Sequence, residues 1–117
     1  MAAECTRNCG CAGCGVVSSV SFVQSGSKWT ATAPNWGTAV LNDDDNTITV
    51  TNTGSKWASF NLYGASCITL EAGDTCTSTR LSSEVPSRGL MVLRTDCGQL
   101  LTGNAFGSWD ELGSTAR

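Results

Sequence analysis

The sequence predicts an all-β fold: an antiparallel β-sandwich, with a jelly roll as the expected topology, preceded by a flexible cysteine-rich arm. Turn signals recur about every eight to twelve residues, which is the spacing typical of sandwiches and barrels. The runs between the turns are rich in β-branched and aromatic residues, and none follows a convincing helical period. A chain of 117 residues also suits one core. We therefore expect a single domain of about eight strands.

The expected strands follow one another with short polar turns between them. The run at 47–51 alternates strictly between Thr and apolar residues, as a half-buried strand does, and the run at 89–94 is the most apolar. Turns at 42–46 and 52–55 are rich in Asn, Asp, Gly and Ser, which favour reversal of the chain. In chain order, strands are expected at residues 16–24, 28–33, 37–41, 47–51, 56–63, 66–70, 75–81, 89–94 and 99–102.

The core is expected on one phase of these runs. Every second side chain of a strand points to the same face, so the apolar phase should face the other sheet. On this basis the sequence predicts that five side chains are buried, namely Ile48, Val50, Leu70, Leu90 and Val92. The tail from 103 to 117 shows no such phase and is expected to be a loop.

Seven cysteines divide the chain into two parts. An arm is predicted at residues 1–15 and a β-sandwich domain at residues 16–117. Because seven is an odd number, the cysteines cannot all pair within one chain, which favours an intermolecular disulfide or a free thiol. Four cysteines lie in the arm and three follow singly in the domain: Cys5, Cys9, Cys11 and Cys14, then Cys67, Cys76 and Cys97.

The arm has almost no apolar side chains with which to dock on another surface. Fixing a backbone costs about 1–2 kcal/mol per residue, and burial by this arm cannot offset that cost. Covalent bonds can, so we expect the arm to form disulfides with a neighbouring copy. Cys97 is the preferred acceptor, because the turn-like stretch 95–98 should lie at the end of the domain. Head-to-tail contacts of this kind produce rings or filaments.

Two other roles for the cysteines stay open. Four thiolates can enclose a zinc ion, but the usual site uses two Cys-x2-Cys knuckles and only Cys11 and Cys14 have that spacing here. No metal ligand is therefore assigned. Cys67 and Cys76 flank an expected hairpin turn at 71–74. A disulfide between them would be strained, since diagonal positions across a hairpin place the Cα atoms about 7–8 Å apart.

Composition argues against several functional classes. Histidine is absent, which removes the commonest general base and the Ser-His and Cys-His pairs, so we expect no enzyme, no catalytic residue and no cofactor. The net charge is −3 and the seven basic residues are scattered, which argues against nucleic acid as a partner. The acidic turn at 43–45 lacks the ligand spacing of a calcium loop. No run approaches the roughly 18 apolar residues of a membrane span.

One short motif occurs twice, and it supports a different class of function. Residues 25–29 read SGSKW, and residues 53–57 read TGSKW. Two copies do not make a solenoid, and both can be ordinary turns. Exposed tryptophans beside lysines can also stack on sugars, so a small carbohydrate-binding module using Trp29, Trp36 and Trp57 is one alternative, and a zinc-binding module is another.

In architecture, the chain resembles the subunits of bacterial endospore appendages. These combine a short cysteine-rich N-terminal connector with a β jelly roll. The resemblance implies that the connector forms disulfides with body cysteines of preceding subunits in a helical fibre. The arm residues that carry the resemblance are Cys5, Cys9, Cys11 and Cys14, and the implied acceptors are Cys67, Cys76 and Cys97.

The predicted function is that of a self-assembling structural subunit of an extracellular, pilus-like filament. Its partners would be further copies of the chain, cross-linked through the arm. The first residues show neither the positive n-region nor the apolar h-region of a signal peptide, so we expect a location outside the cell, or on the cell or spore surface, reached without a Sec signal. Within the structural class, a capsid-decorating or tail protein of a virion is the alternative.

Overall fold

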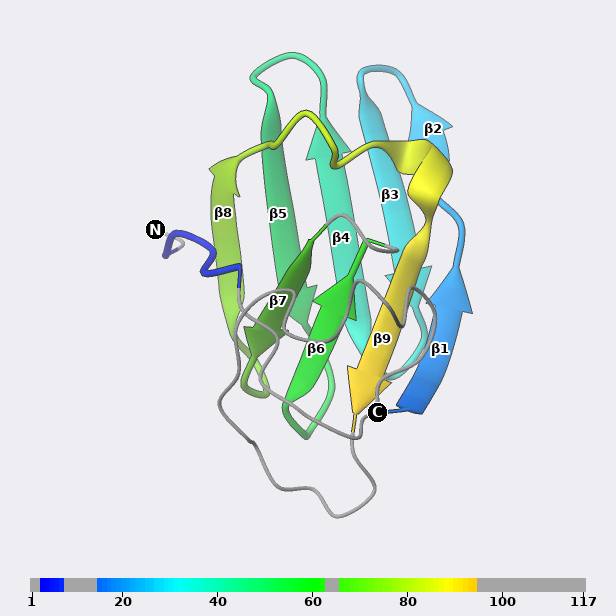
Figure 1. Ribbon diagram of the computed structural model, residues 1–117, viewed down its shortest axis with the longest axis vertical. Coiled ribbons are helices and arrows are strands. Elements are labelled where there is room, and N and C mark those ends of the chain that lie inside the picture. The colour runs from blue at the N-terminus through cyan, green and yellow to red at the C-terminus, as the bar shows by residue number, and fades with distance from the viewer. Residues whose placement is uncertain (1–2, 8–14, 63–65, 95–117) are drawn as a thin grey trace.

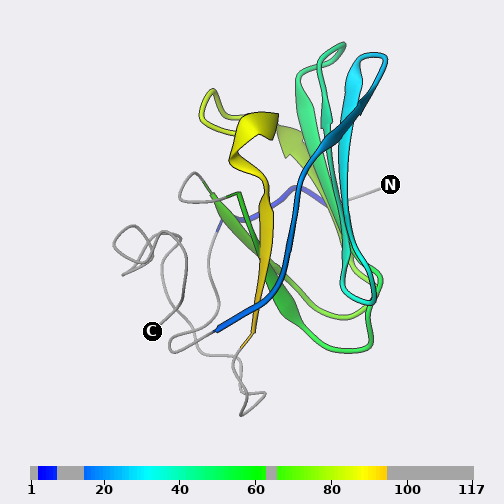
Figure 2. The same cartoon turned by 90° about the vertical axis from the view of Figure 1, so that its right-hand side faces the viewer.

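The protein is described by a computed structural model covering residues 3–7, 15–62 and 66–94. In these ranges the chain forms nine strands and one short 3-10 helix. The strands make two antiparallel sheets that face each other in two layers (Figure 1; Figure 2). The predicted all-β sandwich is therefore confirmed. Among the described residues, no helix is long and apolar enough to cross a membrane.

The two sheets differ in size and in strand order. The four-stranded sheet has, in order, β1 (Gly15–Val20), β9 (Leu90–Arg94), β6 (Ala58–Asn61) and β7 (Cys67–Leu70). The five-stranded sheet has β2 (Val23–Ser25), β3 (Lys28–Ala33), β4 (Gly37–Asn42), β5 (Thr47–Asn52) and β8 (Thr75–Thr79). Four consecutive strands, β2 to β5, thus form a meander. This order does not confirm a jelly roll, which is built from two Greek keys.

The core lies between the sheets, and local sequence alternation explains it. In β5, Ile48 and Val50 are fully buried, while the threonines that alternate with them are half-buried. Ile48 lies opposite Leu41 of β4, so apolar side chains meet on one face of the sheet. Leu90 and Val92 are also fully buried, as predicted. Leu70 is only half-buried against the core, because it ends an edge strand.

Two expected elements are arranged differently. The run at 16–24 is not one strand, because the chain passes between β1 and β2 from one sheet to the other, with Phe22 buried in the core. The runs at 66–70 and 75–81 do not form a hairpin, since β7 and β8 belong to different sheets. The turn between them is instead a crossover, in which Gly73 has a φ of 83°. The strand expected at 99–102 and the loop expected at 103–117 lie outside the described residues.

The 3-10 helix η1 (Pro86–Arg88) is the last element before β9. Pro86 begins it, which suits a residue with a fixed φ and no N–H to donate. Gly89 ends it with a φ of 75°, a conformation that favours glycine. The helix lies at the end of the sandwich near β2 and β3 (Figure 1). It thereby closes one side of a cavity described below.

Candidate functional site

The N-terminal segment 3–7 meets the outer edge of β8 and crosses that side of the sandwich toward the four-stranded sheet (Figure 1; Figure 2). Ala3 pairs with Cys76 in a parallel bridge, and its carbonyl oxygen accepts a hydrogen bond from the Thr77 N–H at 2.8 Å. The Cys5 N–H donates to Ser78 Oγ at 2.6 Å. The segment thus covers part of a sheet edge whose backbone groups would otherwise be open to pairing. We call residues 3–7 the arm segment.

A disulfide fastens the arm segment to β8. It joins Cys5 to Cys76 of the same chain, which lie 71 positions apart in sequence and 4.9 Å apart between Cα atoms. Cys76 is 2% exposed and belongs to the core cluster, and the half-buried Cys5 packs against that cluster. The bond therefore attaches the arm to the close-packed core between the two sheets.

Of the other five cysteines predicted to form cross-links, the structure describes only Cys67. A disulfide between Cys67 and Cys76 does not form, because Cys76 is bonded to Cys5. Cys67 is fully buried and is also disulfide-bonded. The other predicted cross-linking residues lie outside the described residues, namely Cys9, Cys11, Cys14 and Cys97.

A buried ion pair adds a second attachment. Arg7 donates from Nε to Oε2 of Glu84 and from Nη2 to Oε1, both at 2.9 Å. Its Nη2 also donates to the Thr79 carbonyl oxygen at 2.8 Å. The Glu84 side chain is fully buried, whereas that of Arg7 is 20% exposed. Two parallel N–H···O bonds of this kind combine strength with a fixed geometry. We call the edge of β8 together with Glu84 the arm-docking edge.

Glu84 is ionised at neutral pH in spite of its burial. Burial alone raises the pKa of this carboxyl, but hydrogen bonds from Arg7 and from the Leu81 N–H outweigh that effect and hold the pKa below its usual value. The Leu81 N–H donates to Oε1 at 2.8 Å. The same contact raises the pKa of Arg7, chiefly through its hydrogen bond to Glu84. The two charges thus stabilise each other.

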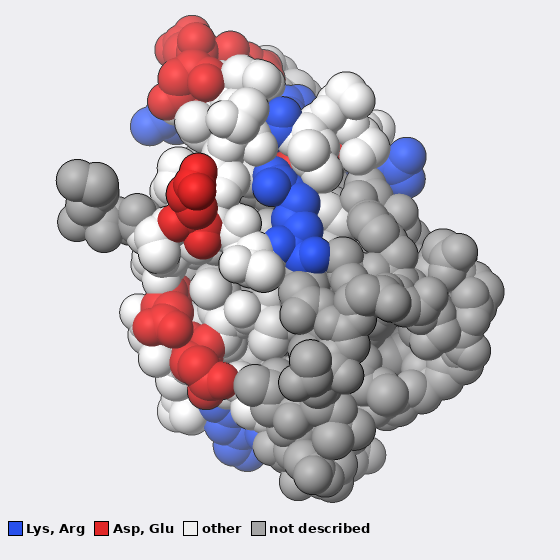
Figure 3. All heavy atoms as spheres, turned by 60° about the vertical axis from the view of Figure 1, so that its left-hand side comes forward, with Lys and Arg blue, Asp and Glu red and all other residues white. Residues whose placement is uncertain are grey.

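A neighbouring cation does not replace Arg7. Arg80 donates from Nε to the Glu84 backbone carbonyl oxygen at 2.8 Å, not to the carboxylate. Its terminal Nη1 pairs with the exposed carboxylate of Asp43 and lowers the pKa of that group. This side of the molecule carries both signs of charge, with acidic residues along one margin and basic residues across the middle (Figure 3). Arg7 is therefore the cation that the structure pairs with the Glu84 carboxylate.

The acidic turn is occupied by its own neighbours. Asp44 accepts a hydrogen bond from Ser27 Oγ at 2.7 Å, and Asp45 accepts one from Thr47 Oγ1 at 2.7 Å. These bonds hold a turn between two strands, which is a common use of aspartate. Within residues 3–7, 15–62 and 66–94, no group of three or more acidic, cysteine or histidine side chains is placed to hold a metal ion.

The opposite edge of the sandwich has a different character. Residues 15–25, which include β1 and β2, carry no charged side chain. Val16, Val17 and Val23 are 38%, 40% and 69% exposed, respectively. Both strands lie at the ends of their sheets. An uncharged edge with exposed apolar side chains is a template for pairing with another strand.

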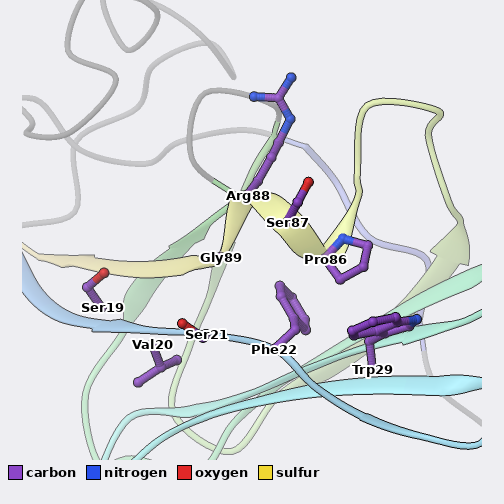
Figure 4. A pocket seen from close by; sticks show the side chains of 9 residues that line it. All are labelled: Ser19, Val20, Ser21, Phe22, Trp29, Pro86, Ser87, Arg88 and Gly89. Atoms are coloured by element: carbon purple, nitrogen blue, oxygen red, sulfur yellow. The ribbon is translucent and has the colours of Figure 1, made fainter.

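A cavity of about 550 Å³ lies between the β1–β2 connection, β3 and η1 (Figure 4). The ring of Phe22 lies beside Pro86, and the ring of Trp29 forms one end of the cavity (Figure 4). Trp29 also donates from Nε1 to Asp43 Oδ2 at 3.3 Å. Ser19, Ser21 and Ser87 also line it, whereas the side chain of Arg88 points away from the two rings (Figure 4). The cavity thus combines apolar rings with hydrogen-bonding groups.

The three tryptophans predicted to bind sugars do not form one platform. Trp36 lines a separate cavity of about 320 Å³ with Asn35, Ser55 and Lys56. Trp57 is only 7% exposed, and the Arg94 guanidinium lies 4.7 Å from its ring centroid. This cation–π contact makes Trp57 part of the fold and not an open stacking surface.

Sequence reasoning missed Arg7 and Glu84. The two residues are 77 positions apart, and no spacing rule connects them. One signal was present, because Arg7 is the single basic residue among residues 1–15.

No family model matches the chain, and no curated protein or solved structure is significantly similar to it.

Proposed function

We propose that the protein is a structural subunit that assembles with copies of itself into an extracellular filament, cross-linked by disulfides through its N-terminal arm. The observation that carries this proposal is the attachment of the arm segment to the edge of β8 by backbone pairing, a disulfide and a buried ion pair. An arm held in this way can occupy the same edge of a neighbouring copy with the same contacts. That exchange is the basis of domain-swapped assembly.

The connection between arm and domain affects whether the arm binds to its own chain or to a neighbouring copy. Residues 8–14 join the arm segment to β1, and their sequence includes two glycines and three cysteines. Because the contacts are the same within and between chains, the protein concentration and the reach of this connection decide which arrangement prevails. The odd number of cysteines leaves at least one thiol that can pair only with another molecule or remain free.

The uncharged edge formed by β1 and β2 supports assembly in a second way. Strand edges of monomeric proteins are usually protected by charges, prolines or bulges. The β1 edge has a bulge between Val16 and Ser18 but no charge, and its valines are exposed. Contacts between subunits along this edge would add backbone hydrogen bonds to the covalent links.

Electrophoresis of the purified full-length chain tests the proposal. After oxidation at high protein concentration, non-reducing gels should show a ladder of oligomers that collapses on reduction, and electron micrographs of the same sample should show fibres. The variant Cys5→Ser should shorten the ladder, while Ser21→Ala, at the β1–β2 connection, should not. A chain that stays monomeric under oxidation, or that binds zinc stoichiometrically as a monomer, would contradict the proposal.

A small carbohydrate-binding module is the second candidate, and the cavity beside Trp29 favours it. Its rings and hydroxyls are the groups that bind the apolar face and the hydroxyls of a sugar. Titration with oligosaccharides should then quench tryptophan fluorescence in the wild type but not in Trp29→Ala. Saturable binding by a protein that forms no ladder would favour this candidate over the filament.

A further inference from the structure

We propose that the arm-docking edge is a recognition site for a Cys-Xaa-Arg segment, residues 5–7 of a second copy of this chain. In this proposal the Arg7–Glu84 ion pair selects which arm cysteine bonds to Cys76. The inference rests on the proposed function for its second copy, whereas the selection by Arg7 applies whichever copy supplies the arm. The disulfide alone cannot make the choice, because the arm contains four cysteines.

Selection by Arg7 follows from the position of one cation in the arm. Cys5 is followed two residues later by Arg7, but the corresponding residues after Cys9, Cys11 and Cys14 are Cys11, Gly13 and Val16. Of the four possible pairings, only that of Cys5 with Cys76 therefore places a positive charge beside Glu84. A bond from any other arm cysteine to Cys76 leaves the buried carboxylate without a cation, which is strongly unfavourable.

The spacing of the two buried side chains in the arm segment also limits the register. Exposure alternates along the arm segment, where Cys5 and Arg7 are half-buried against the domain and Glu4 and Thr6 are exposed. A shift of the arm by one residue turns both side chains away. A shift by two residues places Cys5 or Cys9 opposite Glu84, and neither can replace the guanidinium. Arginine suits the site better than lysine, because its planar fork matches both carboxylate oxygens.

The chemistry of bond formation needs an oxidant, which glutathione disulfide supplies. The Cys76 thiolate displaces one glutathione thiol and forms a mixed disulfide. The Cys5 thiolate then attacks the Cys76 sulfur and displaces the second glutathione, so that two thiols are oxidised and two glutathiones leave. The ion pair acts before the second step, by holding Cys5 and not another arm cysteine beside Cys76.

The test is disulfide mapping of the full-length chain. Equal amounts of unlabelled and ¹⁵N-labelled protein are reduced, mixed and oxidised together in a glutathione buffer, and peptides bonded to Cys76 are identified by mass spectrometry. Cys5 should predominate in the wild type. In Arg7→Gln the ratio of Cys5 to the other arm cysteines should fall by about tenfold or more, because charge-assisted hydrogen bonds are lost. Arg7→Lys should be intermediate.

A relocated arginine makes the test independent of any loss of folding in the single variant. Arg7→Gln combined with Gly13→Arg creates the sequence Cys11-Ala12-Arg, and Cys11 should then become the main partner of Cys76. The matched control is Asp43→Asn, which breaks the exposed ion pair with Arg80 and should leave the wild-type choice unchanged. An unchanged preference for Cys5 both in Arg7→Gln and in the double variant with Gly13→Arg would overturn the inference.

The isotope labels separate this inference from the proposed function. Peptide pairs with one labelled and one unlabelled member report bonds between chains. If Cys5 is selected in an Arg7-dependent way but the two members of every peptide pair carry the same isotope, the selection by Arg7 stands and assembly through this contact fails. If mixed pairs form without any dependence on Arg7, the filament proposal stands and the selection by the ion pair is wrong.

Discussion

Glu84 is a fully buried carboxylate whose ionisation depends on a residue 77 positions away. Without the Arg7 guanidinium, the negative charge would be surrounded by protein with only the Leu81 N–H and other neutral groups as partners. Breaking one side of such a pair is costly because the remaining charge stays buried. The environment of this single residue therefore links the position of the arm to the stability of the whole domain.

The first prediction at this scale compares the two sides of the pair. Arg7→Gln should lower the free energy of unfolding at pH 7 by about 3 kcal/mol, since it leaves an uncompensated buried charge. Glu84→Gln should cost less, because the half-buried Arg7 keeps access to water. Urea denaturation measures both. The exposed substitution Glu71→Gln should change the free energy by less than about 0.5 kcal/mol. Equal, negligible losses in both variants would contradict this account.

The pH dependence of the wild type has a defined sign. The pKa of Glu84 is lower in the folded state than in the unfolded chain, where it is about 4.3. Its contribution to stability is therefore complete above that value and is lost as the pH falls through the folded pKa. In Arg7→Gln the loss relative to wild type should shrink in acid, because protonation removes the buried charge.

At the scale of elements, close approach of backbone and ring explains one glycine in β4. A Cβ atom at Gly37 would lie 2.1 Å from the Thr51 carbonyl oxygen and 2.9 Å from the Phe60 ring. Gly37 lies opposite Asn52 of β5, so the obstruction is within the sheet as well as across the sandwich. A strand glycine often marks such a position.

The prediction for this element uses a pair of identical substitutions. Gly37→Ala should destabilise the protein by about 3 kcal/mol or more, because β4 must move away from β5 or from Phe60. Gly15→Ala is the control, since a Cβ there meets nothing within 4 Å. It should be neutral or slightly stabilising. Thermal denaturation of both variants decides the matter, and a neutral Gly37→Ala would show that the sheets are farther apart than described.

At the scale of the whole molecule, the Cys5–Cys76 disulfide closes a loop of 71 positions, more than half of the chain. It ties the first described residues to β8, an edge strand of the five-stranded sheet. A cross-link of this length restricts the unfolded chain, and the chain-entropy account assigns it about 4 kcal/mol. The bond therefore stabilises the domain even when the arm contributes little apolar burial.

Replacing one cysteine tests that contribution. Cys5→Ser should lower the free energy of unfolding by as much as about 4 kcal/mol under non-reducing conditions. The native fold should persist, because Cys76 lies in a core formed by both sheets. Urea denaturation followed by circular dichroism measures the change. A loss below about 1 kcal/mol would contradict this estimate and would mean that the ion pair and backbone hydrogen bonds alone keep the arm of the variant attached.

Much of the sandwich follows from local sequence. The alternation at 47–51 and the β-branched residues at 28–33 specify strands whose bounds agree with the structure to within one residue. Burial of Ile48 and Leu90 also follows, because side-chain direction in a strand is set by position parity. Local patterns could not predict that the run at 16–24 changes sheets at Phe22, since an apolar residue fits either continuation.

The sequence by itself determined the all-β class and most of the strand positions between residues 15 and 94. These properties depend on neighbours one to four positions apart. Only the tertiary structure decided that β7 and β8 belong to different sheets, that Cys5 bonds to Cys76, and that Glu84 is buried against Arg7. The disulfide and the ion pair join residues more than 70 positions apart, and they depend on which edges the packed sheets bring together, which no local pattern encodes.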